Sequence, residues 1–405
     1  MYQPRTIEKT LVKNNAHYPV LLVTGARQVG KTTLLKHLAD DSREYISLDS
    51  PIELNQAQTD PAIFMQRHPG RILIDEIQYA PQLLPYIKMA ADENKMPGQF
   101  WLTGSQQFHM MKNVTESLAG RVGISTLLGL SHRELIGQGH EHSVFRPSEQ
   151  FFNELDGNIL TTPELYRLIW RGSFPVPAIN EDVDRDGFLD NYVQTYLQRD
   201  VRDLTKVNNL LDFWRFLRAC AARTGQLLNI AELSRDAHIS PVTGKNWLSI
   251  LVASNIVYLL EPYFANVTKR LVKAPKLYFL DTGLAAYLTD WDSPKNLESG
   301  AMSGAIFETW VIGELLKSWR GNGLRPPFYY YRDKDQKEID LLIVQNGQLF
   351  PLECKKTASP NNNDIRHFQV LDKLKMPVTI GGVICMAPRA MPLTAKAWII
   401  PVGCV

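Results

Sequence analysis

The stretch GARQVGKTT contains residues whose types and spacing can hold phosphate groups. Gly25, Gly30, Lys31 and Thr32 fit the pattern G-x-x-x-x-G-K-[ST], and Thr33 follows them. Glycines allow backbone N–H groups to close around phosphates at the start of a helix, and the lysine can reach the β- and γ-phosphates. The Thr32 hydroxyl is expected to bind Mg²⁺. An apolar run before the loop and a helical pattern after it therefore predict a nucleoside triphosphate site.

Two further segments supply the polar groups that such a site needs. In RILIDEIQ, three apolar residues predict a buried strand that ends at Asp75 and Glu76. We expect Asp75 to hold Mg²⁺ through water and Glu76 to polarise the attacking water. An ordinary acidic cap between a strand and a helix is the alternative. GQFWLTGSQQF predicts a third strand, at whose end Ser105 is expected to sense the γ-phosphate.

The stretch EIDLLIVQNGQLFPLECKKT places two acids on facing strands. Asn346-Gly347 is a strong signal for a two-residue hairpin turn. With that turn, Asp340 lies directly opposite Glu353, and Lys355 shares the face of Glu353. Two carboxylates in this position repel each other. A Mg²⁺ ion between them would remove the repulsion, and the lysine beside it could position a water.

A helix upstream of the hairpin carries another acid that needs a partner. In GAIFETWVIGELLKSW, helical spacing places Glu308 within an apolar stripe. A buried acid is costly without a partner, so we expect Glu308 to join the metal site. The alternative is an ordinary hairpin in which Lys355 links Glu338 to Glu353.

The middle of the chain predicts a DNA-binding module. NIAELSRDAHIS is a short helix with a turn, SPVTGKNWLSILVASN begins with helix-capping residues, and two strands follow, which is a winged-helix pattern. Residues 202–280 contain eleven Lys/Arg and five Asp/Glu, a net charge of +6. A protein-interaction module is the alternative. The expected DNA contacts are Thr243, Lys245 and Asn246 on the second helix and Lys269, Arg270, Lys273 and Lys276 on the wing.

The phosphate loop, the acidic strand and the segment SLAGRV resemble the AAA+ superfamily of P-loop ATPases. This resemblance implies ATP and Mg²⁺ as cofactors, with Lys31 and Glu76 in catalytic roles. It also implies that Arg121, which follows the helix of that segment, acts on the nucleotide of a neighbouring subunit. The subunits would then form a head-to-tail ring, with a hexamer as one expected form. A surface arginine at a helix end is the alternative.

Two further resemblances extend over the rest of the chain. GARQVGKTTLL, IDEIQ, LTGSQ, SLAGRV, YLQRDV and FLDTGLAAYL are similar to a prokaryotic AAA-type ATPase family with a C-terminal domain of unassigned function. Glu308, Asp340, Glu353 and Lys355 resemble the motif of the PD-(D/E)xK nuclease superfamily, in which such residues bind Mg²⁺ and cleave phosphodiesters. The proline usual before the strand acid is replaced by Ile339. Because binding-only relatives also carry this motif, it implies the fold more firmly than cleavage.

Bulk properties set the limits of these predictions. The chain has 405 residues, 44% of them hydrophobic, and a net charge of +2, as in multidomain globular proteins. Four cysteines without paired spacing, no signal-like N-terminus and no apolar run of bilayer length predict a cytoplasmic protein that contacts no membrane.

We therefore expect an α/β chain of four parts. These are a AAA+-like P-loop domain with a parallel sheet, a helical connector, a winged helix and a restriction-endonuclease-like α/β domain, at residues 1–150, 151–205, 206–292 and 293–405. The expected function is ATP-driven remodelling, translocation or processing of DNA, with a nuclease-like domain that could use Mg²⁺. The alternative is a nucleotide-dependent switch or scaffold whose C-terminal parts only bind partners.

Overall fold

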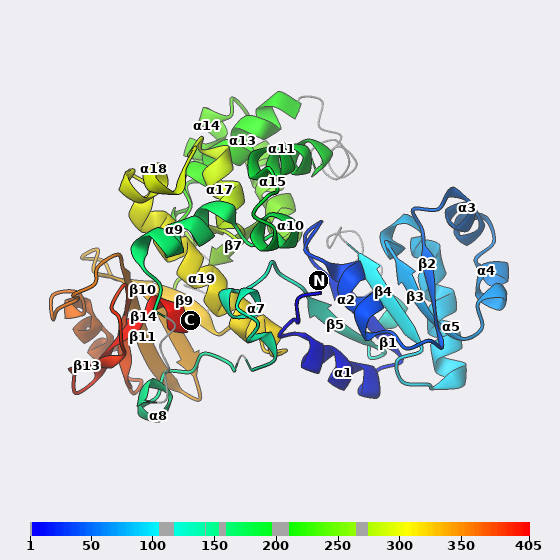
Figure 1. The fold of residues 1–405 in the computed structure, drawn as a ribbon, viewed down its shortest axis with the longest axis horizontal. Helices are drawn as coiled ribbons and strands as arrows, with labels where there is room; N and C mark the ends of the chain where they lie inside the picture. The colour runs from blue at the N-terminus through cyan, green and yellow to red at the C-terminus, as the bar shows by residue number, and fades with distance from the viewer. Residues whose placement is uncertain (1, 105–116, 142, 154–158, 197–209, 265–273) are drawn as a thin grey trace. The chain divides into compact units, whose positions relative to one another are not determined.

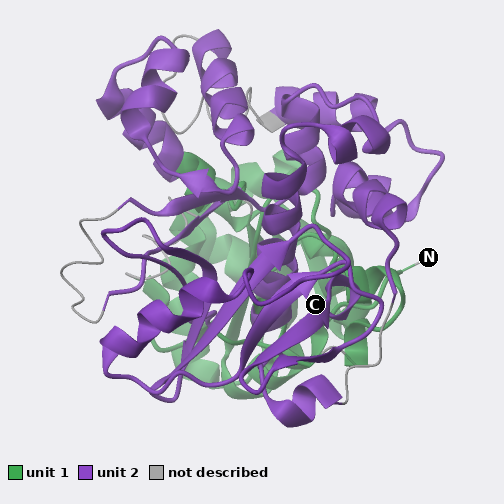
Figure 2. Cartoon of the chain, turned by 90° about the vertical axis from the view of Figure 1, so that its left-hand side faces the viewer, with its two compact units in different colours: residues 1–143, 250–256, 320–324 green, residues 144–249, 257–319, 325–405 purple. Residues whose placement is uncertain are grey.

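The computed structural model describes residues 2–104, 117–141, 143–153, 159–196, 210–264 and 274–405. These form two compact units, coloured separately in Figure 2. Unit 1 comprises residues 1–143, 250–256 and 320–324, and unit 2 comprises residues 144–249, 257–319 and 325–405. None of the described helices has both the length and the apolar composition needed to cross a bilayer.

Unit 1 is built on a five-stranded parallel sheet in the order β2-β3-β4-β1-β5 (Figure 1). Its strands are β1 (Val20–Thr24), β2 (Arg43–Ser47), β3 (Arg71–Asp75), β4 (Phe100–Gly104) and β5 (Val122–Thr126). All residues of β1 and β4 are buried, as expected for central strands covered on both faces. The predicted strands before the phosphate loop, before Asp75 and after residue 98 are confirmed.

Local signals explain how several helices of unit 1 begin. Proline stands in the first turn of α3 and α4, and the Asp60 side chain accepts a hydrogen bond from the Ile63 N–H at the start of α4. The helical elements of this unit are α1 (Glu8–His17), α2 (Lys31–Leu38), α3 (Pro51–Thr59), α4 (Pro61–Arg67), η1 (Ile77–Tyr79), η2 (Pro81–Leu83), α5 (Leu84–Asn94), α7 (His132–Leu135) and η3 (Gly139–Glu141).

Unit 2 begins with helices. Thr161 and Glu164 form a capping box that starts α9. The described helices of this part are α8 (Glu149–Asn153), α9 (Thr162–Arg171), α10 (Pro175–Ile179) and α11 (Arg185–Tyr196). Their helical character agrees with the expected connector, whereas its boundaries stay a prediction.

A second part of unit 2 combines three helices with a small antiparallel sheet in the order β6-β8-β7. A Cβ at Gly244 would lie 2.2 Å from the Ser234 Oγ, so α14 and α15 cross closely at this glycine. The elements are α13 (Leu210–Ala222), β6 (Gln226–Leu227), α14 (Ile230–Asp236), α15 (Pro241–Ala253), β7 (Val257–Leu260) and β8 (Lys276–Phe279), and the part of α15 from Ile250 onward is counted in unit 1. The order of elements is the expected one, and the winged-helix assignment stays a prediction.

The last part of unit 2 is a mixed six-stranded sheet in the order β13-β14-β12-β11-β10-β9. Gln345 pairs with Gln348, and Asn346 and Gly347 have φ values of 51° and 73°, which confirms the predicted two-residue turn. The elements are α17 (Thr282–Leu288), α18 (Pro294–Ser299), α19 (Ser303–Gly321, of which Arg320 and Gly321 are counted in unit 1), β9 (Phe328–Arg332), β10 (Glu338–Gln345), β11 (Gln348–Lys355), η5 (Arg366–Leu374), β12 (Gly381–Cys385), β13 (Met391–Thr394), β14 (Ala397–Pro401) and η6 (Val402–Cys404).

Candidate nucleotide site and acidic cluster

The phosphate loop connects the carboxyl end of β1 to the start of α2. Gly25 and Gly30 have φ values of 149° and 93°, a region of backbone conformation that favours glycine. The buried Lys31 ammonium donates hydrogen bonds to the carbonyls of Gly25 at 3.1 Å and Ala26 at 2.8 Å. The lysine is therefore held against the start of its own loop, where an incoming phosphate could exchange with these carbonyls.

Asp75 collects hydrogen bonds from three neighbouring elements. The Thr32 hydroxyl donates to both carboxylate oxygens, at 2.8 and 2.9 Å. The Tyr45 hydroxyl donates at 3.0 Å from β2, and the Thr103 hydroxyl donates from β4. Because the carboxyl ends of parallel strands meet at one edge of the sheet, residues far apart in sequence converge on this carboxylate.

Glu76 follows Asp75 in a left-handed backbone conformation, with φ 58° and ψ 47°. A residue other than glycine pays about 1 kcal/mol or more for such a conformation. The Glu76 N–H donates to the Thr103 Oγ1 at 3.1 Å, and the Gln78 amide donates to the Glu76 carboxylate. Thr103 thus connects the backbone of Glu76 to the carboxylate of Asp75.

These groups fit a nucleotide with Mg²⁺. The Thr32 hydroxyl and the Asp75 carboxylate are hard oxygen donors in direct contact, which is the donor chemistry that Mg²⁺ prefers. The start of α2 offers N–H groups without helical partners to an anion.

The structure places the remaining residues predicted for this site as follows. Thr33 is exposed on α2, and Ser105 lies outside the described residues. Arg121 forms an ion pair with Asp92 of the same chain, with one Nη2–Oδ2 contact of 3.0 Å. This contact is compatible with the surface-arginine alternative, and the role across a subunit interface stays a prediction.

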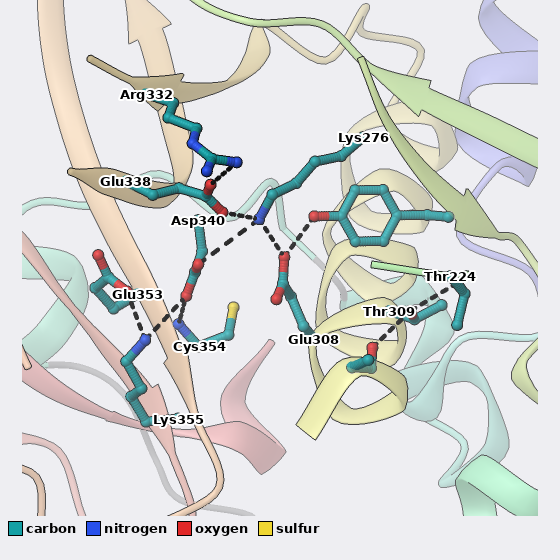
Figure 3. A network of polar contacts seen from close by, with 12 residues as sticks. Thr224, Lys276, Glu308, Thr309, Arg332, Glu338, Asp340, Glu353, Cys354 and Lys355 are labelled. Carbon is teal, nitrogen blue, oxygen red and sulfur yellow. Dashed lines mark hydrogen bonds and ion pairs between the residues drawn. The ribbon is translucent and has the colours of Figure 1, made fainter. Parts of the chain in front are cut away.

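A second cluster of charged residues lies in unit 2, where β8, α19 and β10 meet (Figure 3). Lys276 extends from β8, and its ammonium lies 3.1 Å from Glu308, 2.6 Å from Glu338 and 3.8 Å from Asp340. The Tyr278 hydroxyl, also on β8, donates to Glu308 at 2.5 Å. The Lys276 ammonium and the Tyr278 hydroxyl therefore offset the cost of burying the Glu308 carboxylate.

The hairpin supplies the second half of this acidic cluster. The Lys355 ammonium lies 2.8 Å from Glu353 and 3.3 Å from Asp340 (Figure 3). Asp340 also accepts a hydrogen bond of 3.0 Å from the Cys354 N–H. Asp340, Glu353 and Lys355 thus meet as expected, but Lys355 does not link Glu338 to Glu353 as the hairpin alternative proposed.

Burial and neighbouring charges shift the pKa values of the cluster. Burial, followed by the charge of Asp340, raises the pKa of Glu308 to about 7 and the pKa of Glu353 to about 9. Burial acts in the same direction on Asp340, but Lys276 and Lys355 outweigh it and lower its pKa. Burial lowers the pKa of each lysine, but the adjacent carboxylates outweigh it and keep both lysines charged.

The metal site expected at Glu308, Asp340 and Glu353 stays a prediction, and lysines lie among these acids in the structure. Within the described ranges, no group of three or more His, Cys, Asp or Glu side chains is placed to hold a metal ion. Lys276 stands between Glu308 and Asp340, and Lys355 stands between Asp340 and Glu353. Two ammonium groups therefore compensate the acids where the sequence led us to expect Mg²⁺.

The residues predicted to contact DNA have different outcomes. Lys245 and Asn246 are exposed in the first half of α15, and Thr243 is half-buried. The prediction for Lys276 is wrong, because its side chain is buried, with 3% of the residue exposed, and is committed to the acidic cluster. Lys269, Arg270 and Lys273 lie outside the described residues.

Sequence reasoning missed several participants. Tyr45 at the nucleotide site and Tyr278 in the acidic cluster carried no recognisable motif. One signal in the sequence could have pointed to Tyr278. Lys276 and Tyr278 are two positions apart on an apolar strand, so their side chains lie on the same face. That signal could not tell which acids they would meet.

Three parts of the chain match family models. Residues 17–136 match an AAA domain, residues 162–295 match a domain of unknown function (DUF8612), and residues 303–405 match another domain of unknown function (DUF4143).

Similar proteins occur among curated sequences and solved structures. Uncharacterized proteins of Mycobacterium tuberculosis and Mycobacterium bovis are each 30% identical to the chain over 345 residues, which are 85% of the chain and 71% of the relative. A Walker-type ATPase of Pyrococcus abyssi is similar over 71% of the chain and 99% of its own length, with 16% identity and a TM-score of 0.42. A DNA replication initiation factor is similar over 61% of the chain and 90% of its own length, with 14% identity and a TM-score of 0.26.

Proposed function

Because the chain belongs to a family of AAA-type P-loop ATPases that it shares with the two mycobacterial proteins, we propose that it hydrolyses ATP in order to act on DNA. The observation that carries this proposal is the convergence of Lys31, Thr32, Asp75 and Glu76 at one edge of the parallel sheet.

Each residue has a distinct task in this proposal. Lys31 leaves the loop carbonyls and contacts the β- and γ-phosphates, while loop N–H groups hold the phosphate oxygens. Thr32 and Asp75 would hold Mg²⁺, which neutralises phosphate charge when it is bound. Glu76 accepts a hydrogen bond from the attacking water and orients it. Thr103 fixes the backbone of Glu76 beside Asp75.

The ATPase proposal is tested by Lys31→Ala, with Lys36→Ala as the matched control. Both lysines lie on α2, but Lys36 is exposed and its ammonium lies over the Tyr45 ring. Lys31→Ala should abolish ATP hydrolysis, measured as phosphate release, and Lys36→Ala should leave most of it intact. Equal rates in wild type and Lys31→Ala would contradict the proposed site.

The small helical and antiparallel part of unit 2 supports the DNA proposal. Its α14 and α15 pack closely at Gly244, and the first half of α15 exposes Lys245 and Asn246. The net charge of +6 over residues 202–280 includes Lys276, so the surface of this segment carries less positive charge than the sequence suggests. The DNA contacts are accordingly expected at the start of α15.

Lys245→Ala tests this surface, with Lys295→Ala as a control at a lysine on α18 that is also exposed. We expect Lys245→Ala to weaken binding to all duplex sequences and to reduce the slope of log K against log salt by about 1. Binding and the DNA-stimulated ATPase rate should be measured with duplex and branched DNA. Identical salt slopes in both variants would remove α15 from the DNA interface.

Self-association is a separate part of the proposal. Arg121 can reach a neighbouring subunit only after it leaves Asp92. Asp92→Ala should therefore preserve ATP hydrolysis, whereas Arg121→Ala should lower it by about a thousandfold if the arginine acts on the transition state. A loss of hydrolysis that is equal in both variants would assign the pair to the stability of unit 1.

The acidic cluster favours a second candidate, a nucleotide-dependent switch whose C-terminal sheet binds a partner without cleaving DNA. Lys276 and Lys355 already compensate the acids that a nuclease would use to hold metal. The discriminating measurement is nicking of supercoiled DNA with Mg²⁺ by wild type, Glu353→Ala and Lys355→Ala. Cleavage lost in both variants would support a nuclease, and ATP hydrolysis without DNA stimulation would support the switch.

A further inference from the structure

A buried arginine outside the recognised motif holds the back of the phosphate loop. Arg5 precedes α1, and only 5% of it is exposed. Its Nη1 donates to the Val29 carbonyl of the loop at 3.0 Å. Its Nη2 donates to the carbonyls of Leu128 at 2.7 Å and Gly129 at 3.2 Å, just after β5. Arg5 thus ties the loop to the segment that follows an adjacent strand.

The contact with Val29 determines where the next N–H group points. The described chain contains no cis peptide bond, and in a planar trans peptide the C=O and the following N–H point in opposite directions. Because the Val29 oxygen is held toward Arg5, the Gly30 N–H must point away from Arg5. This N–H lies at the start of α2, where the backbone donors are free of helical partners and can receive an anion.

The segment after β5 also fixes the beginning of the loop. A Cβ at Gly25 would lie 2.2 Å from the Leu127 oxygen, so the first glycine of the loop packs directly against this segment. The Leu127 N–H donates to the Thr24 carbonyl at 2.8 Å. One segment therefore holds the loop at Gly25 by direct contact and at Val29 through Arg5.

Glu134 offsets the electrostatic cost of burying the Arg5 guanidinium. Its carboxylate lies 3.1 Å from the Arg5 Nε, accepts the Thr6 N–H at 2.8 Å and completes the capping box of α7. A buried guanidinium is costly without such a partner. The charge pair therefore stabilises Arg5 in the position from which its guanidinium contacts Val29.

We propose that Arg5 is a positioning residue of the nucleotide site, which presets the Gly30 N–H to donate to a phosphate oxygen. The inference rests on the proposed ATP-binding function and adds a residue to it. Arg5 acts through Val29 and does not touch the nucleotide. Its effect should be confined to ligands that carry phosphate.

The variant Arg5→Lys tests this role. It keeps the positive charge beside Glu134, but a lysine cannot donate hydrogen bonds to the Val29 and Leu128 carbonyls at the same time. Arg43→Lys is the matched control. Arg43 is also buried, with 8% exposed, and donates to the carbonyls of Ile72 and Gln99 at 3.3 and 3.2 Å, at the opposite ends of the strands. Arg5→Gln, which removes the charge, provides a second and larger change.

The experiment measures binding of ATP, ADP and adenosine, ATP hydrolysis and thermal unfolding for the full chain. We expect Arg5→Lys to weaken ATP and ADP about tenfold, as for one hydrogen bond to a charged group, and to raise KM more than it lowers kcat. Arg5→Gln should weaken them further, while the affinity for adenosine stays unchanged in both. Arg43→Lys should lower thermal stability without a change in nucleotide affinity.

Three results would overturn the inference. ADP affinity that is equal in wild type and Arg5→Lys would refute the positioning role and leave the ATPase proposal intact. Parallel losses for ADP and adenosine, or equal losses in Arg43→Lys, would make Arg5 only a stabilising residue. A wild-type chain that binds neither ATP nor ADP would refute the proposed function and the inference together.

Discussion

Replacement of Lys276 with methionine removes the cation from the acidic cluster while it keeps most of the aliphatic stem. The ammonium has three carboxylates within 4 Å, and at an effective dielectric constant of about 20 each pair contributes about 4 kcal/mol of attraction at that distance. Much of this attraction is offset by the cost of burying the charges. We therefore expect a loss of about 3–5 kcal/mol in the free energy of unfolding, as for other buried pairs deprived of one partner.

Lys355→Met is the control for this prediction. Lys355 pairs with acids of the same cluster, but 36% of its side chain is exposed, compared with 4% for Lys276. Solvent screens the Lys355 pairs more strongly, so its loss should cost about 1 kcal/mol. The double variant Lys276→Met with Glu308→Gln should recover part of the loss, because it removes one of the carboxylates left unpaired.

Urea unfolding of the full chain, followed by tryptophan fluorescence, measures these differences. Hydrogen exchange locates the destabilised region. In Lys276→Met, the amide protection of β10 and β11 should fall more than the amide protection of unit 1. If Lys276→Met costs no more than Lys355→Met, the contacts of Lys276 do not stabilise the cluster as argued. The same conclusion would follow if adding Glu308→Gln to Lys276→Met recovered none of the lost unfolding free energy.

Three further changes test separate features. Because burial and Asp340 raise the pKa of Glu353 from 4.5 to about 9, its stabilising contribution is complete below pH 4.5 and is lost as the pH rises through 9. Glu353→Gln should therefore flatten the decline of unfolding free energy between pH 5 and 9 by a few kcal/mol, measured by urea unfolding in the presence of a chelator. Gly244→Ala should cost about 1–3 kcal/mol in the same assay, because its Cβ would lie 2.2 Å from the Ser234 Oγ, and Ser234→Ala in the same chain should relieve part of this cost. Gly25→Ala should weaken ADP binding at least tenfold, since φ is 149° and its Cβ would meet the Leu127 oxygen; unchanged affinity in a nucleotide titration would contradict the packing described for the loop.

The parts of the fold that the sequence predicted well depend on local chemistry. Glycine spacing fixes the phosphate loop, and an apolar run that ends in Asp75 fixes the strand beside it. Asn346-Gly347 determines the hairpin, and with it the pairing of Gln345 with Gln348. In each case the deciding residues are neighbours in sequence, so no tertiary contact has to be known.

The partners of the buried charges could not be predicted in this way. Lys276 and Glu308 are 32 positions apart, and Arg5 and Leu128 are 123 positions apart. A count of charges along the chain treated Lys276 as part of a basic surface, because such a count does not separate buried lysines from exposed ones. Only the position of β8 beside α19 and β10 shows that Lys276 forms ion pairs with the acids of these two elements.

The charge balance of the acidic cluster bears on what the C-terminal sheet can do. With a pKa of about 9, Glu353 is largely protonated at pH 7, and Lys276 and Lys355 remain charged. Arg332, at 3.5 Å, adds a further positive charge beside Glu338. The acids are therefore close to neutralised without any bound ion. A divalent cation at this cluster would compete with Lys276 and Lys355 for the same carboxylates, so the positions of these two lysines bear directly on what chemistry the cluster can support.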